Sequence, residues 1–100
     1  MGYMRLSTYE EKALKSALAG FEGDVYVFGS RLDPNKQGGD IDILLKPKLR
    51  TDKYHLKTRV ASCFERELEQ SLDVVVFDDQ SPFCQEIIKY AEPLDLTRLS

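Results

Sequence analysis

The chain has 100 residues, a length typical of one domain with one hydrophobic core. Its apolar fraction of 42% excludes general disorder, and its net charge of −3 is opposite to that of most dedicated nucleic-acid-binding proteins. Two isolated cysteines, Cys63 and Cys84, and one histidine, His55, lack the spacing of a zinc site. The chain starts without an apolar signal region, and no apolar run reaches the ~20 residues of a membrane span, so we expect a cytoplasmic protein.

The first predicted element is a helix that begins near Ser7. Ser7 and Thr8 precede Glu10 and Glu11 at the spacing of a capping box. Apolar residues then recur at helical spacing and predict one inward-facing stripe, formed by Tyr9, Ala13, Leu14, Ala17, Leu18 and Phe21. Residues 24–28 are mostly apolar and β-prone, which predicts a buried strand.

The middle of the chain predicts a loop, a strand and a long helix. Residues 32–39 are dense in turn formers, and residues 41–45 form a second strand that Pro47 ends. Thr51 or Asp52 caps the helix that follows. Its buried stripe consists of Leu56, Val60, Phe64 and Leu68.

A third strand over residues 72–77 precedes a last helix. Asp78, Asp79 and Ser81 are candidate caps for this helix, and Pro82 fits its first turn. The residues expected to face inward are Phe83, Ile87, Ile88 and Ala91. The chain is therefore predicted to form a single α+β domain over residues 1–100, in which helices cover a small mixed sheet of three or more strands. We expect Tyr26, Tyr54 and both cysteines to be buried or partly buried, without a chemical role.

Two carboxylates share one face of the second strand. Side chains alternate along a strand, so Asp40 and Asp42 point to one face while Ile41 and Ile43 point to the other. Carboxylates at ~4 Å repel by ~1 to 4 kcal/mol, and a divalent cation between them reverses the sign of the interaction. Oxygen ligands without sulfur or imidazole select Mg²⁺ or Mn²⁺. Acidic residues also alternate with apolar ones on ordinary exposed strand faces, so the pair alone is a weak signal.

Two further features flank this pair. Gly29, Ser30 and Arg31 come directly after the first strand, where exposed backbone N–H groups, a hydroxyl and a guanidinium can hold phosphates. Asp73 opens the third strand, a position where a lone aspartate is more often a strand-entry residue. The combination over residues 24–77 resembles the DNA polymerase beta-like nucleotidyltransferase superfamily, and most closely its minimal members, the MNT-type antitoxin domains.

The resemblance implies a function and a set of roles. Asp40, Asp42 and Asp73 would be the catalytic metal ligands for Mg²⁺, with two ions bound. Gly29 and Ser30, with Arg31, would contact the phosphates of ATP. The minimal members commonly act as antitoxins of a helical HEPN-domain toxin, so the resemblance implies that the chain transfers AMP from Mg-ATP to a tyrosine of such a partner.

Some features leave alternatives open. Gly38 and Gly39 precede the paired aspartates where many relatives carry a small polar residue, which puts the phosphate contacts of this loop in doubt. Inhibition of a toxin by binding alone and transfer to RNA or to a small molecule are the alternative functions. A basic stretch, Lys46 to Arg59, would serve RNA or an acidic partner surface, or is simply a solvated face.

Overall fold

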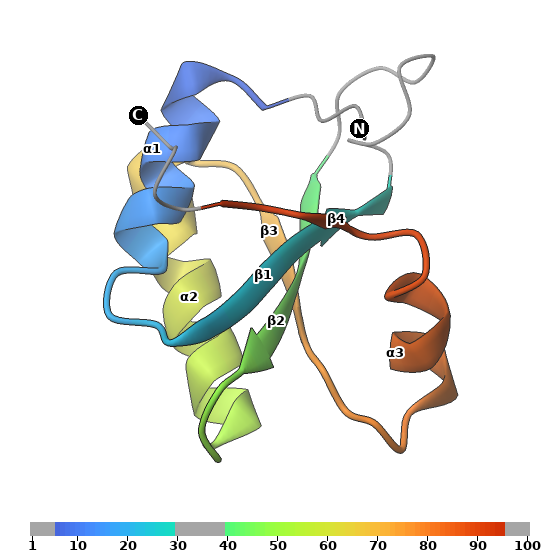
Figure 1. The fold of residues 1–100 in the computed structure, drawn as a ribbon. Coiled ribbons are helices and arrows are strands. Elements are labelled where there is room, and N and C mark those ends of the chain that lie inside the picture. Colours follow the sequence, from blue (N-terminus) through green and yellow to red (C-terminus); the bar gives the residue numbers. More distant parts are fainter. Residues whose placement is uncertain (1–5, 30–39, 96–100) are drawn as a thin grey trace.

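A computed structural model describes residues 6–29 and 40–95 (Figure 1). The elements of this part are α1 (Thr8–Ala17), β1 (Gly23–Phe28), β2 (Ile41–Pro47), α2 (Lys53–Leu68), β3 (Leu72–Val76), α3 (Pro82–Ile87) and β4 (Glu92–Pro93). The loop predicted over residues 32–39 lies outside the described residues. None of the helices in the described part has both the length and the apolarity needed to span a bilayer.

The strands form one mixed sheet in the order β3-β2-β1-β4. β1 pairs antiparallel with β2 and with β4, whereas β2 and β3 are parallel and joined through α2. The mixed sheet and its helices confirm the predicted α+β class. β4 was not predicted, because two residues that include Pro93 carry no alternating pattern; it forms because the Leu94 N–H donates to the Val25 carbonyl at 2.8 Å. Pro93 is tolerated there because β4 lies at the sheet edge.

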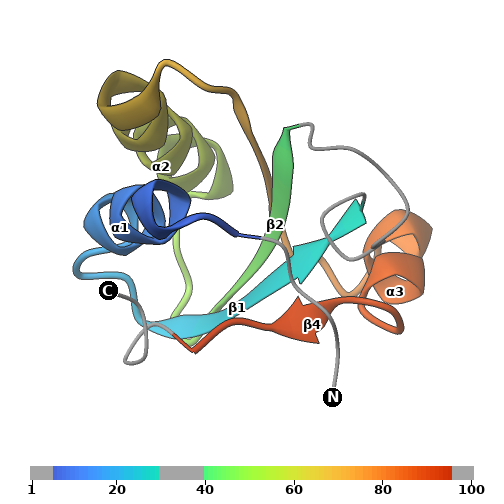
Figure 2. The same cartoon turned by 90° about the horizontal axis from the view of Figure 1, so that it is seen from above.

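The main core lies between the sheet and the helices α1 and α2, which lie side by side on one face (Figures 1 and 2). Every second residue of β1 and β2 points into this core, and Phe64 of α2 and Leu14 of α1 are fully buried against them. The strand residues of the core are Val25, Val27, Ile41, Ile43, Leu45, Leu72 and Val74. α3 lies apart from α1 and α2 (Figure 2).

Capping residues begin the helices where the sequence predicts. Ser7 accepts from the Glu10 N–H at 3.1 Å, and the Glu10 carboxylate accepts from the Ser7 N–H at 2.9 Å, which confirms the capping box. Asp52 caps α2 and Ser81 caps α3. Glu10 also accepts from Gln70 Nε2 at 2.7 Å, so the start of α1 is tied to the chain that follows α2.

Three aromatic residues expected in the interior are exposed instead: Tyr9 by 74%, Tyr54 by 79% and Phe83 by 56%. In α1 the inward position is taken by Glu10, which is 6% exposed and satisfied by the capping box and by Gln70. In α3 it is taken by Cys84, the neighbour of Phe83. Neighbouring residues on a helix lie ~100° apart, so the burial of one turns the other outward.

Candidate functional site

The paired strands bring two of the predicted site carboxylates directly opposite each other. Asp42 lies next to Asp73 in the parallel pairing of β2 with β3, and next to Phe28 in the antiparallel pairing of β2 with β1. Residues that are direct neighbours across strands share a face of the sheet. Phe28, Asp42 and Asp73 therefore form a row across the face opposite to the main core.

A second row, of apolar residues, lies on the same face of the sheet, two residues along the strands from the row that contains Asp42. Leu44 is fully buried there, between Tyr26 on β1 and Val75 on β3. Asp42 is half-buried at the end of this apolar strip, whereas Asp73 is exposed. Phe28 and Leu44 were not predicted as neighbours of the site, although the alternation of residues along β1 and β2 was a signal that could have identified them.

The environment of Asp42 favours its neutral form. Burial, followed by the negative charge of Asp73, a hydrogen bond with the Asp73 carboxyl and the charge of Asp40, raises the pKa of Asp42 from 3.8 to about 6. Asp42 and Asp73 thus form a close pair of carboxyl groups that repel each other once both are ionised. A protein keeps such a pair at a cost in stability, which points to a functional role.

Gly29 lies against the same carboxylate from the β1 side. Its φ of +82° is a conformation that residues with a side chain rarely adopt. A Cβ atom added to Gly29 would collide with Oδ2 of Asp42. Only glycine therefore allows the chain leaving β1 to pass this close to Asp42, and the first residue of the predicted phosphate-binding segment is brought to the carboxylate pair.

Of the remaining predicted site residues, only Asp40 belongs to the described part of the chain. Asp40 is exposed and lies directly before β2, close enough for its charge to act on Asp42. Within residues 6–29 and 40–95, no three acidic, histidine or cysteine side chains stand in an arrangement ready to hold a metal ion. Ser30 and Arg31, as well as Gly38 and Gly39, lie outside the described residues.

The donor set nevertheless fits a hard divalent cation. Asp42 and Asp73 offer carboxylate oxygens at close range, and the repulsion that adds to burial in raising the pKa of Asp42 is an interaction that a cation would relieve. Mg²⁺ usually takes one or two protein carboxylates and completes its shell with water and substrate phosphates. Asp42 and Asp73 would therefore be the protein ligands of a first ion, and Asp40 is near enough in sequence to contribute.

The predicted basic stretch is not part of the carboxylate pair, and its residues line several cavities. Lys48 is six residues further along β2 and its extension, roughly 20 Å from Asp42. Lys46 lies over the ring of Phe77, 5.1 Å from its centroid. Lys48, Arg50 and Lys53 line one cavity, Arg50 also lines a second cavity together with Arg59, and Lys53 lines a third together with Lys57.

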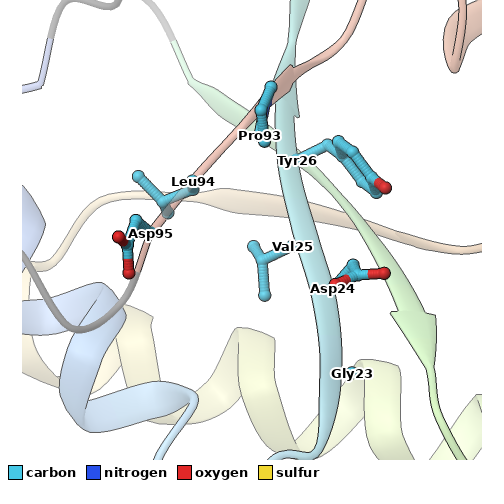
Figure 3. Close-up of a pocket in the computed structure, with 7 residues that line it drawn as sticks. All are labelled: Gly23, Asp24, Val25, Tyr26, Pro93, Leu94 and Asp95. Atoms are coloured by element: carbon cyan, nitrogen blue, oxygen red, sulfur yellow. The ribbon is translucent and has the colours of Figure 1, made fainter.

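A separate cavity of about 340 Å³ lies where β1 extends beyond β4 (Figure 3). Figure 3 shows that its two carboxylates, Asp24 and Asp95, lie on opposite sides of β1 and do not converge. The cavity is also remote from Asp42, since Asp24 pairs with Lys46 near the other end of β2. We therefore assign the candidate site to the carboxylate pair.

No family model matches the chain, and neither does any curated protein. Among solved structures, the fold is similar to that of an MNT antitoxin in complex with the tri-AMPylated HEPN toxin of Shewanella oneidensis. The two chains share 21% sequence identity with a TM-score of 0.56, over 84% of this chain and 67% of that chain. At this identity the similarity shows the fold alone, and it agrees with the α+β fold expected from the sequence.

Replacing Asp42 by Asn is expected to stabilise the metal-free protein near neutral pH. The folded state raises the pKa of Asp42, so its ionised form costs stability above about pH 6 and the cost disappears below pH 3.8. We expect a gain of about 1 kcal/mol after allowing for screening by water at this half-buried group. Denaturant unfolding in the presence of a chelator, at neutral pH and below pH 3.8, measures it.

The matched control is Asp24→Asn, an exposed aspartate on the same face of the sheet. It should change the free energy of unfolding by no more than about 0.5 kcal/mol. If Asp42→Asn is instead destabilising at neutral pH, the carboxylate pair is not held under repulsion.

Proposed function

We propose that the chain transfers AMP from Mg-ATP to a hydroxyl group of a partner protein, as the antitoxin of a HEPN-domain toxin. The observation that carries the proposal is the meeting of Asp42 with Asp73 on one side and with Gly29 on the other. A carboxylate pair beside a glycine turn offers both halves of a nucleotide site, a cation ligand set and an approach for phosphates.

Within this proposal, each predicted residue has a distinct role. Asp40, Asp42 and Asp73 would hold Mg²⁺, with two ions bound. Gly29 lets the backbone approach the phosphates, and Ser30 and Arg31 would contact them. When bound, the metal ions would neutralise charge on the attacking and leaving oxygens of the displacement.

The reaction is an in-line displacement at the α-phosphorus of ATP. The acceptor oxygen forms a bond to this phosphorus, the bond to the β-phosphate bridging oxygen breaks, and pyrophosphate leaves. The acceptor hydroxyl proton passes to the Asp73 carboxylate, the exposed member of the pair. The products are a nucleotidylated acceptor and pyrophosphate, and the contribution of the protein is positioning and charge stabilisation.

The structural neighbour supports the choice of partner. That protein is an MNT antitoxin bound to an AMPylated HEPN toxin. The present chain shares its fold and places two of the three expected carboxylates together. A tyrosine of a HEPN-domain toxin is therefore the acceptor that we propose.

The proposal predicts a mass gain on the partner. The product of the neighbouring gene would be incubated with the chain and Mg-ATP, and its intact mass recorded. We expect one or more AMP groups in the presence of the wild-type chain. Asp42→Ala should slow the transfer about a hundredfold or more, because even residues that only orient metal ligands are worth 10- to 100-fold.

Asp24→Ala is the control for this assay and should leave the transfer unchanged. A partner that is inhibited by the wild-type chain without any mass gain would contradict the transfer and establish inhibition by binding alone.

A pair of glycine substitutions separates the geometry of the site from backbone strain. Gly29 and Gly20 have φ values of +82° and +83°, but only at Gly29 would a Cβ atom meet Asp42, and at Gly20 it would meet nothing. Both Gly→Ala changes should cost stability through the same backbone strain, and Gly29→Ala should cost more because its Cβ atom meets Asp42; only Gly29→Ala should abolish AMP transfer. Equal transfer by the two variants, measured by intact mass, would show that the close passage at Asp42 has no catalytic role.

A further inference from the structure

A groove lies along the free edge of β3, between α2 and α3. Its volume is about 390 Å³, and its floor consists of Val74, Val75 and Val76. Lys53, Tyr54 and Lys57 form the α2 side, and Phe83 and Cys84 form the α3 side. β3 is an edge strand of the sheet in the described part of the chain, so the groove contains backbone that β2 does not pair.

The direction of the backbone groups at this edge follows from the pairing with β2. The Phe77 N–H donates to the Leu45 carbonyl at 2.7 Å, so the odd-numbered residues of β3 point their backbone groups toward β2. The N–H and carbonyl of Val74 and the N–H of Val76 then point into the groove. An extended peptide placed there can continue the sheet.

The walls of the groove carry apolar surface and positive charge. Tyr54 and Phe83 are 79% and 56% exposed, which is unusual for two large aromatic residues beside one strand edge. Lys57 forms no ion pair with another described residue, whereas Lys53 pairs at 4.0 Å with Asp78, which also lines the groove. Two lysines against one aspartate leave a net positive charge, which fits an occupant with acidic and apolar side chains.

The charge also excludes a second copy of this chain as the favoured occupant. Pairing two copies edge to edge along β3 would bring Lys53 and Lys57 of one copy toward the same residues of the other. Like charges at such a contact repel, and lysines beside an edge strand are a common protection against this kind of self-association. An acidic segment gains from the same charges.

We propose that this groove, defined by Lys53, Tyr54, Lys57, Val74–Val76 and Phe83, binds an extended acidic and apolar segment of the partner by adding it to the sheet beside β3. The groove leads to the carboxylate pair, since Asp73 precedes Val76 by three residues, or roughly 10 Å of strand. A hydroxyl residue on the docked segment therefore reaches Asp73. That last step rests on the proposed AMP transfer, whereas the docking itself does not.

The test uses synthetic peptides and no nucleotide, so that its outcome concerns the groove alone. The acidic probe is a blocked ten-residue peptide of alternating Glu and Val with one Tyr. A basic probe has Lys in place of each Glu, and a third probe is the acidic one with Pro at its central Val positions, which removes the N–H groups needed for sheet pairing. Binding is followed by amide chemical shifts of the ¹⁵N-labelled full chain.

We expect the acidic probe to bind with shifts centred on Val74 and Val76, and the proline probe to bind about tenfold more weakly. Lys53→Glu/Lys57→Glu should weaken the binding of the acidic probe by about tenfold or more. The control variant Lys12→Glu/Lys48→Glu, with the same change in net charge on lysines outside the groove, should bind like the wild type. Equal binding of the basic probe, equal loss in both variants, or shifts away from β3 would overturn the proposal.

The AMP-transfer assay separates the docking of a segment in the groove from the proposed AMP transfer. Docking of the acidic probe together with failure of AMP transfer to the HEPN-domain partner would leave the groove established and contradict the proposed function. AMP transfer to the partner without any docking of the acidic probe would contradict the groove.

Discussion

The position of β2 between β1 and β3 is the constraint on which the site depends. Its antiparallel register sets Asp42 beside the end of β1, where the chain turns at Gly29, and its parallel register sets Asp42 beside Asp73. A shift of either register by one residue would turn Asp42 into the core that α1 and α2 cover. The buried residues Ile41 and Ile43 prevent that shift, so the core that stabilises the fold also aligns the carboxylates.

One face of the sheet stabilises the fold, and the other carries the candidate site. The first is a continuous apolar layer under α1 and α2, whereas the second carries Asp42 and Asp73 next to one fully buried residue, Leu44. The raised pKa of Asp42 shows that the second face holds ionisable groups where solvation is poor. A core of this size can tolerate a local cost of that kind, which is common at functional sites.

The sequence predicted what depends on local pattern. The capping residues Ser7 and Asp52 and the alternation of β2 are short-range features, and the structure agrees with them. The pairing of Asp42 with Asp73 depends on the crossover through α2, so only the family resemblance suggested it. β4 and the outward turns of Tyr9 and Phe83 were missed, because tertiary partners decide between neighbouring positions on a short element.

The most direct test of the account is a titration of the ¹⁵N-labelled chain with Mn²⁺, followed by paramagnetic broadening of the amide signals. Mn²⁺ prefers the same oxygen ligands as Mg²⁺. The account predicts that the signals of Gly29, Asp42 and Asp73 disappear first, before those of the consecutive acidic residues Asp78 and Asp79. Broadening centred on Asp78 and Asp79, or spread evenly over all acidic residues, would contradict the claim that the sheet assembles a cation site at Asp42 and Asp73.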